Sequence, residues 1–240
     1  MISRAHKLAA IAIRPQLWPA LWLRVAPTVE HEASLSRFAF GTVIDVGANK
    51  GQFAAFAAAT WPQARLECFE PLPAPRARLQ QVLRTFAAER STVHDLACSR
   101  ESGLALMHVA SREDSSSLLP LGDRQREMFG MDEAGQLSVR TERLDQVVSG
   151  ELARPALLKI DVQGFEYEVL EGATALLPNI DVVYVEASFV ELYAGQKLAD
   201  EIERFLWGHG FALKGRFNTH FDTDGSAIQA DLLFVGAEPR

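Results

Sequence analysis

The stretch that decides the fold is VIDVGANKG, residues 43–51. Its first half, from Val43 to Val46, is a short apolar run that ends at a glycine, which is typical of a buried strand. The Ala- and Phe-rich segment 52–59 follows and predicts a helix that ends before Pro62. In an open parallel sheet, ligands bind beyond the carboxyl ends of the strands, so this strand-to-helix turn is the first candidate binding site.

The rest of the chain continues this alternation of apolar runs and helical stretches. We expect strands at 65–70, 92–97, 156–160, 181–186, 211–216 and 231–235, and helices at 73–89, 165–177 and 198–207. This order predicts parallel strands joined by right-handed crossovers. The last two strands are separated by a polar loop and no helix, so they predict an antiparallel hairpin that closes one edge of the sheet.

One segment departs from this alternation of strands and helices. Residues 99–142 hold weaker strand patterns at 103–109 and 136–141, with the serine-rich stretch 111–119 between them. We interpret residues 99–142 as an insertion near the active face.

Residues 1–40 also differ from the rest. Leu17, Leu21 and Val25 recur at a four-residue step with two tryptophans beside them, which predicts a helical appendage. Packing on the core or against a homodimer partner is the simplest role, and a substrate lid or a peripheral membrane contact is the alternative. The expected organisation is therefore this appendage followed by a catalytic domain over 41–240.

The composition narrows the classes of protein. A chain of 240 residues with 48% hydrophobic content is long enough for one domain with a sizeable core. Its formal net charge of -7 argues against a nucleic-acid partner. Cys68 and Cys98 form neither a disulfide framework nor a zinc pattern.

No apolar run approaches the ~18 residues of a spanning helix. Arg14-Pro15 interrupts the apolar N-terminus too early for a secretory signal. We therefore expect a cytoplasmic protein, with membrane association as an open alternative.

The spacing of the first glycines favours a particular ligand. Gly47 and Gly51 form Gly-x-x-x-Gly, which does not match the Gly-x-Gly-x-x-Gly fingerprint of dinucleotide sites. The Asp45 carboxylate would repel a diphosphate, but it suits the ammonium group of a methionine-like ligand. We expect S-adenosylmethionine as the cofactor, with Asp45, Gly47, Asn49 and Gly51 around it. A plain turn is the alternative interpretation.

Two further strand ends carry acidic residues that suit the same ligand. Glu70 lies 25 positions after Asp45 and is placed to accept hydrogen bonds from ribose hydroxyls. Asp95 would reach the adenine amino group, with backbone contacts from Leu96 and Ala97. The alternatives are a solvated carboxylate at Glu70 and a turn-capping role for Asp95.

A second acidic turn, KIDVQGFE, occupies residues 159–166. Asp161 and Glu166 bracket its glycine, where carboxylates can orient or deprotonate a hydroxyl or hold a metal. Glu186 ends the next strand, and a pair with Asp161 would raise the pKa of one carboxyl or recruit a cation. Alternatively, Glu166 stabilises the N-terminus of the following helix.

His220 lies in the polar stretch Asn218-Thr219-His220, which we expect to be a loop between the last two strands. Near the cleft it would serve as a general base, and the alternative is an ordinary surface histidine. No Gly-x-Ser-x-Gly elbow of a serine hydrolase is present in the sequence.

Taken together and in this order, the segments resemble the FkbM-type methyltransferases over residues 42–236. The matching segments are VIDVGANKG (43–51), FEPLP (69–73), SSSL (115–118), RLD (143–145), LKIDVQGFE (158–166), VLEGA (169–173) and DLLFV (231–235). The resemblance implies a Rossmann-like class I α/β fold with a seven-stranded, mostly parallel sheet, an antiparallel last strand and helices on both faces. It also implies methyl transfer from S-adenosylmethionine to a hydroxyl of a small molecule, a sugar, glycolipid or polyketide-type product.

The resemblance and the residues together suggest roles within the cleft. We expect Asp161 or His220 to be the catalytic base and Glu186 to orient the acceptor, with Asp161 also contacting the cofactor. Ser116 and Glu166 join Glu186 and His220 as expected acceptor contacts. If a divalent metal takes part, Asp161 and Glu186 would bind it, but Gln163 stands where the family often has Glu, which weakens that expectation.

Two rival functions come from other classes. A nicotinamide-dependent oxidoreductase is disfavoured by the missing third glycine of the dinucleotide fingerprint. The other rival is a non-catalytic cofactor-binding module with the same fold.

Overall fold

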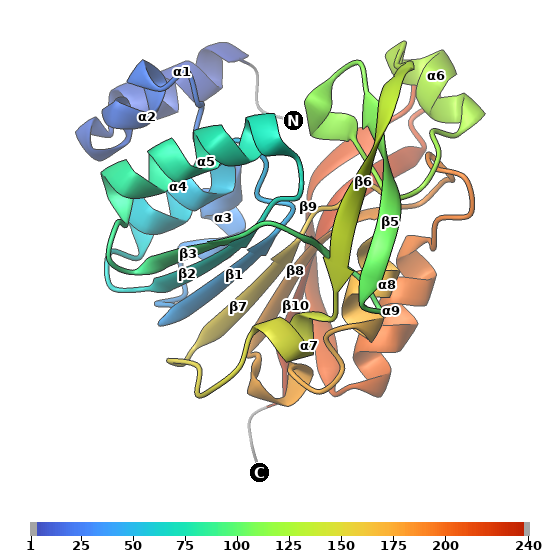
Figure 1. Ribbon diagram of the computed structural model, residues 1–240. Coiled ribbons are helices and arrows are strands. Elements are labelled where there is room, and N and C mark those ends of the chain that lie inside the picture. Colours follow the sequence, from blue (N-terminus) through green and yellow to red (C-terminus); the bar gives the residue numbers. More distant parts are fainter. Residues whose placement is uncertain (1–3, 238–240) are drawn as a thin grey trace.

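The computed structural model describes residues 4–237 and contains the predicted seven-stranded sheet (Figure 1). The strand order is β3-β2-β1-β7-β8-β10-β9. The strands are β1 (Thr42–Val46), β2 (Arg65–Phe69), β3 (Ser91–His94), β7 (Ala156–Ile160), β8 (Val182–Ser188), β9 (Phe211–Phe221) and β10 (Ala227–Gly236). Only β10 runs antiparallel to its neighbours, β8 and β9. The predicted fold class and the antiparallel last strand are confirmed.

The two central strands, β1 and β7, are buried on both faces of the sheet. Every residue of β1 and β7 is buried, as expected for parallel strands covered by helices. Their register pairs Asp45 directly with Lys159 and Val46 with Ile160. The only two charged residues of these strands therefore face the same buried position.

Helices cover both faces of the sheet, and successive strand residues alternate between them. On one face, α4 (Gln52–Thr60) and α5 (Pro73–Phe86) pack over Val43 and Leu157. On the other, α7 (Leu144–Val147), α8 (Glu166–Glu171) and α9 (Ala199–Gly208) pack over Ile44 and Leu158. Figure 1 shows these two layers on opposite sides of the strands.

Several predicted boundaries are wrong. The helix expected at 73–89 ends at Phe86, and the helix expected at 165–177 ends at Glu171, after which residues 172–176 form turns. The strand expected at 92–97 is divided into β3 and β4 (Ala97–Cys98). The last two strands are longer than expected, because residues 217–221 pair with β10 and only 222–226 form the turn.

Residues 97–142 form a second, three-stranded sheet of order β4-β6-β5. Strands β5 (Gly103–Ala110) and β6 (Glu133–Glu142) are antiparallel. Between them lie the 3-10 helix Glu113–Ser115 and α6 (Asp123–Phe129). This second sheet occupies the region where the sequence suggested an insertion.

The N-terminal segment folds as short helices on the α4–α5 layer. They are α1 (Arg4–Ala12), α2 (Trp18–Trp22) and α3 (Glu32–Leu35), with 3-10 turns at Pro15–Leu17 and Val29–His31. The apolar face packs inward through Ala20 and Val25, which contact Ala55 of α4 and Val82 of α5. Prolines at the start of the 3-10 turn Pro15–Leu17 and near the start of α2 divide the segment into short pieces.

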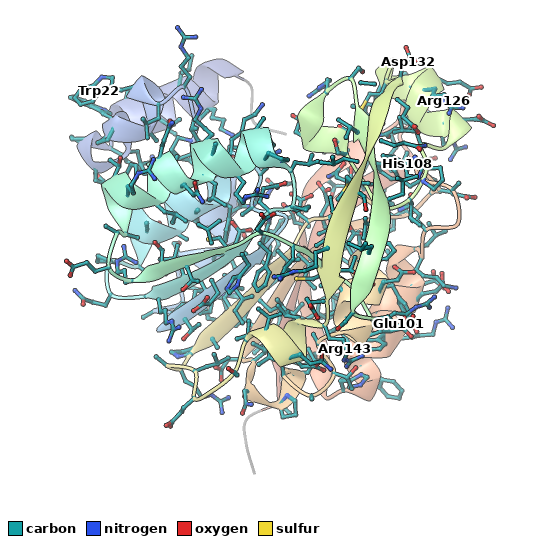
Figure 2. The ribbon with its side chains drawn as sticks, in the orientation of Figure 1. Trp22, Glu101, His108, Arg126, Asp132 and Arg143 are labelled. Carbon is teal, nitrogen blue, oxygen red and sulfur yellow. The ribbon has the colours of Figure 1, made fainter. Side chains whose placement is uncertain are left out.

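The opposite face of this segment is open to solvent. Trp22 is 82% exposed and lies at the outer surface of the N-terminal helices (Figure 2). Among residues 4–237, no helix is long and apolar enough to cross a bilayer.

Candidate functional site

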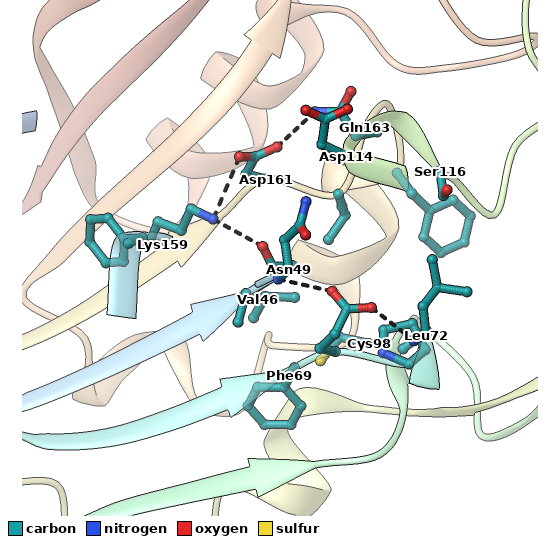
Figure 3. Close-up of a pocket in the computed structure, with 18 of the residues that line it drawn as sticks. Val46, Asn49, Phe69, Leu72, Cys98, Asp114, Ser116, Lys159, Asp161 and Gln163 are labelled. Atoms are coloured by element: carbon teal, nitrogen blue, oxygen red, sulfur yellow. Dashed lines mark hydrogen bonds and ion pairs between the residues drawn. The ribbon is translucent and has the colours of Figure 1, made fainter. Parts of the chain in front are cut away.

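A cavity of about 280 Å³ opens at the carboxyl ends of β1, β2 and β7. The chain runs from β1 to β2 and β3 on one side and returns to β7 on the other, so β1 and β7 form the topological switch point of the sheet. Ligands of doubly wound sheets bind at this position. Its lining comes from the strand ends, from the 3-10 helix after β5 and from the N-terminal segment (Figure 3).

The glycine turn after β1 shapes one wall of this cavity. Gly47 has φ +80°, and a Cβ there would lie 1.9 Å from the carbonyl oxygen of Asp161. Only glycine allows the two strand ends to approach so closely. Asn49, also in the left-handed region at φ 47°, lines the cavity two residues later.

Gly51 has a different role from the one expected. It does not line the cavity. A Cβ added at Gly51 would lie 3.2 Å from side-chain atoms of Leu79 and Val82 in α5. Gly51 therefore lets α4 and α5 pack closely and does not contact a ligand in this cavity.

Glu70 lines the cavity as predicted. Its Oε2 accepts a hydrogen bond from the Asn49 backbone N–H at 2.9 Å, and its Oε1 accepts one from the Leu72 N–H at 2.8 Å. Burial raises the pKa of Glu70 to about 7, despite these two backbone hydrogen bonds. Each carboxylate oxygen has a second lone pair, so Glu70 can still accept hydrogen bonds from a ligand.

Asp95 is not brought into the cavity. Its side chain is 68% exposed and pairs with Arg76 on the outer surface. The reason is the break between β3 and β4, which turns Asp95 outward while Leu96, Ala97 and Cys98 reach the cavity wall. Ala97 lies where it was expected.

Asp45 is fully buried beneath the cavity and does not line it. The Lys159 ammonium lies 3.0 Å from Asp45 Oδ1 and 3.6 Å from Asp161 Oδ2. Burial disfavours the charged form of Lys159, but the two carboxylates outweigh it and raise the pKa of the ammonium above its ordinary value. Asp45 therefore reaches the cavity only indirectly, through its ion pair with Lys159, a lining residue that the sequence analysis missed.

A signal for Lys159 was present in the sequence. A lysine inside an otherwise apolar, fully buried strand needs a partner, because lysine is almost never buried unpaired. Asp45 in the other central strand was the matching carboxylate, but only the strand register shows that the two residues are opposite each other.

Asp161 and Glu186 are brought together through Gln163. The Gln163 side-chain amide donates to Asp161 Oδ1 at 2.8 Å and to Glu186 Oε2 at 2.9 Å, and its carbonyl accepts a hydrogen bond from the Tyr193 hydroxyl at 3.0 Å. Burial, and then the neighbouring carboxylate of Asp161, raises the pKa of Glu186 well above its ordinary value. A glutamate at position 163 could not donate these two hydrogen bonds when ionised.

This arrangement is a poor fit for a metal ion. Gln163 directs its N–H groups into the space between Asp161 and Glu186, where a cation would need free oxygens. Within the described part of the chain, no three His, Cys, Asp or Glu side chains are grouped as metal ligands.

Glu166, expected to contact the acceptor, lines neither cavity described here. It is buried, and its Oε1 accepts hydrogen bonds from the backbone N–H groups of Val162 and Gly164 at 3.1 and 3.0 Å. Glu166 therefore holds the turn closed at the start of α8, close to the alternative role that the sequence suggested.

A second cavity of about 660 Å³ adjoins the first. The two cavities share Thr28, His31, Asp114 and Asp161 in their linings. Most residues that line the second cavity have polar side chains; besides the shared residues, these are Lys7, Glu30, Glu186, Asn218, His220, Gln229 and Asp231.

The remaining predicted residues divide between these cavities. Ser116 lines the first, and its hydroxyl accepts a hydrogen bond from the Ala110 N–H at 3.2 Å. His220 lines the second, but it lies in strand β9 and not in a loop, because it pairs with Gln229 of β10. Burial lowers the pKa of His220.

The sheet order and the cavity at its switch point define a class I methyltransferase fold. Among solved structures, a putative rRNA methylase from Clostridium thermocellum has a TM-score of 0.50 at 11% identity, over 86% of this chain and 95% of that one. This likeness concerns the fold alone. The family model for the methyltransferase FkbM domain matches residues 45–213, so the chain belongs to the FkbM methyltransferase family.

Several curated relatives are similar to the chain. The 31-O-demethyl-FK506 methyltransferase FkbM of Streptomyces tacrolimicus is 32% identical over 82% of this chain and 77% of its own length. The 2-O-methyltransferase NoeI of Sinorhizobium fredii is 30% identical over 64% of this chain and 66% of its own. The AMB antimetabolite synthetase AmbE of Pseudomonas aeruginosa is 33% identical over 72% of this chain. The chain spans just under two thirds of NoeI and 10% of AmbE.

Proposed function

We propose that the chain transfers a methyl group from S-adenosylmethionine to a hydroxyl oxygen of a small molecule. The observation that carries this proposal is the junction of two cavities, one at the switch point of the sheet and one polar, which share the side chains of His31 and Asp161. A cofactor in the first cavity and an acceptor in the second would meet at that junction.

The residues of the first cavity fit S-adenosylmethionine. Glu70 offers carboxylate oxygens for ribose hydroxyls, and Leu96 to Cys98 provide an apolar wall for an adenine ring. Asn49 Oδ1 is buried beside them and accepts no hydrogen bond within residues 4–237, so it offers an acceptor to a bound ligand. When bound, the cofactor supplies an activated methyl sulfonium.

The second cavity suits a hydroxylated acceptor. The Asp161 carboxylate accepts hydrogen bonds, the Glu186 carboxyl can donate or accept them because its raised pKa favours the protonated form, and the amides of Asn218 and Gln229 can also do both. The names of NoeI, a 2-O-methyltransferase, and of the Streptomyces 31-O-demethyl-FK506 methyltransferase both describe transfer to oxygen, which supports a hydroxyl acceptor. The resemblance to the FkbM family suggests that this acceptor is a sugar, glycolipid or polyketide-type product. The protein's main task is to hold the acceptor oxygen in line with the methyl group, since positioning alone supplies a large part of such rate enhancements.

The proposal is tested with isotopically labelled S-adenosylmethionine and fractionated saccharide and lipid extracts, followed by mass spectrometry. We expect a product labelled on oxygen. A calorimetric titration with S-adenosylhomocysteine and with NAD accompanies it, and we expect only the first to bind. Binding of S-adenosylhomocysteine without labelling in any extract would instead support a cofactor-binding module.

The role of Glu70 has its own control. Glu70→Gln keeps the size of the side chain but removes its charge and one acceptor, so the affinity for S-adenosylhomocysteine should fall. Asp95→Asn is the matched variant on the outer surface and should leave that affinity unchanged, because Asp95 does not line the cavity. Equal losses in both variants would contradict the placement of the cofactor.

A further inference from the structure

His31 stands at the junction of the two cavities although it lies outside the family match, which begins at residue 45. It belongs to the 3-10 turn Val29–His31 of the N-terminal segment. Its ring packs edge-on against Phe53 of α4 and Tyr184 of β8, with centroids 5.5 and 5.3 Å away. The imidazole is therefore fixed in place, with 12% of the side chain still accessible.

The hydrogen bonds around His31 set its tautomer. The Tyr184 hydroxyl donates to Asp231 Oδ2 at 3.0 Å, and its oxygen lies 3.2 Å from His31 Nδ1 and 3.1 Å from Ser34 Oγ. Asn218 Nδ2 lies 3.5 Å from His31 Nδ1 but donates to Asp231 Oδ2 at the shorter distance of 2.8 Å, and that oxygen lies 3.4 Å from Nδ1. With two oxygen acceptors near it, we assign the proton to Nδ1 and a lone pair to Nε2.

Nε2 has no hydrogen-bond partner within the described residues. The His31 side chain lines both cavities and keeps part of its surface accessible. A histidine held at Nδ1 by a network around a buried carboxylate, with Nε2 open to a reactant, is arranged as a general base.

The other titratable groups at the junction are poorer bases. Asp161 already accepts a hydrogen bond from Gln163 at 2.8 Å and lies 3.6 Å from the Lys159 ammonium, so both of its oxygens have partners other than an acceptor hydroxyl. Asp114 is solvent-exposed and lies 3.5 Å from Arg112. His220 lines the second cavity but not the first.

We propose that His31, positioned by Asp231 and Tyr184, is the general base that takes the proton of the acceptor hydroxyl. The acceptor oxygen forms a bond to the methyl carbon while the sulfur–methyl bond breaks and leaves its electron pair on sulfur. The hydroxyl proton passes to His31 Nε2, and the resulting imidazolium is stabilised by the Asp231 carboxylate. The proton then leaves to water. This proposal rests on the proposed function.

The test compares His31→Asn with His209→Asn, using the acceptor fraction labelled by the wild type. Asparagine keeps a donor near the Nδ1 position but removes the base. We expect His31→Asn to lower kcat by about 10²-fold or more, with KM and the affinity for S-adenosylhomocysteine nearly unchanged. His209 is exposed at the end of α9 and lines neither cavity, so His209→Asn should retain most of the wild-type kcat. Comparable kcat values for His31→Asn and the wild type would overturn the assignment.

A pH profile separates a base from a purely structural residue. The titratable and charged groups facing His31 are Asp231 on β10, Tyr184 on β8 and Asp45 on β1, with Lys159 and Asp161 across the junction. If His31 is the base, the acid limb of kcat that reports its protonation should disappear in His31→Asn, and Asp231→Asn, which removes the carboxylate beside Nδ1, should lower kcat and alter that limb. An acid limb that stays in place in both Asp231→Asn and His31→Asn would contradict the proposal.

Nitrogen-15 NMR of histidine-labelled protein with S-adenosylhomocysteine bound adds a measurement that needs no acceptor. At pH 8 we expect the His31 proton on Nδ1, and a proton on Nε2 would overturn the assignment. If the wild type binds S-adenosylhomocysteine but labels nothing, the proposed function fails and the base role fails with it. If the wild type labels an acceptor and His31→Asn does so equally well, only the base role fails.

Discussion

The two cavities are built in different ways. The first is formed by strand ends and tight turns at the switch point, and its critical features are a glycine backbone at Gly47 and a carboxylate held by backbone N–H groups at Glu70. The second is formed by side chains from the N-terminal segment, from β8 and from the final hairpin. A short local motif can specify the first, but only the assembled fold creates the second.

The largest effect should come from breaking the buried charge pair beneath the first cavity. Lys159→Met leaves Asp45 buried without its counter-charge, which costs roughly 3–5 kcal/mol in the free energy of unfolding. Denaturant unfolding measures this loss. Adding Asp45→Asn to Lys159→Met should recover much of the stability, and a double variant as unstable as the single one would show that the pair is not the cause.

The next effect tests the close approach at Gly47. Gly47→Ala should lower the free energy of unfolding by roughly 3 kcal/mol and abolish binding of S-adenosylhomocysteine, because the new Cβ meets the Asp161 carbonyl. Gly195→Ala is the matched control, with a similar φ of +79° and no atom within 4 Å of the new Cβ. It should cost only about 1–2 kcal/mol from backbone strain. Equal losses would rule out the contact with Asp161 as the cause.

A pH titration sharpens the role of Glu70. Since the pKa of Glu70 is raised to about 7, its carboxyl gains a proton as the pH falls through that value and loses an acceptor for a ribose hydroxyl. Affinity for S-adenosylhomocysteine should therefore weaken between pH 8 and pH 6, as measured by calorimetry. Glu70→Gln should bind more weakly than the wild type at pH 8 and show a flatter pH dependence. A wild-type affinity that is constant over this range would contradict the prediction.

The smallest effect concerns the independence of the two cavities. Glu70 and Glu186 share no hydrogen-bond partner among the described residues, so the changes that Glu70→Gln and Glu186→Gln cause in cofactor binding free energy should add within about 0.5 kcal/mol. Calorimetry on the two single variants and the double variant measures the coupling. A larger coupling would show that the two cavities act as one unit.

The sequence analysis succeeded where local patterns decide the structure. The buried strand before Gly47, the strand-end carboxylate Glu70 and the helix-free final hairpin were all predicted from neighbouring residues. It failed where a residue's direction depends on distant contacts. Asp95 turns outward because β3 ends one residue earlier, and Glu166 turns inward to hold its own turn.

The residues missed in the sequence are those whose roles depend on a distant partner. Lys159 depends on strand register, and His31 depends on Asp231, 200 positions later in the chain. Gln163 was noted as a departure from the family pattern, but its two hydrogen bonds to Asp161 and Glu186 appear only in the folded chain. No spacing rule within one segment can find such partners.

By itself, the sequence determined the α/β class, the order of strands and helices, and the place of the first cavity after residues 43–46. These features follow from periodicity, turn chemistry and chain order, which act over short distances. The tertiary structure alone decided that Asp45 is buried beneath the cavity with Lys159, and that the N-terminal segment places His31 beside Asp161. The reason is that strand register and burial bring together side chains that lie far apart in the sequence, and the residues around each of them do not reveal its partner.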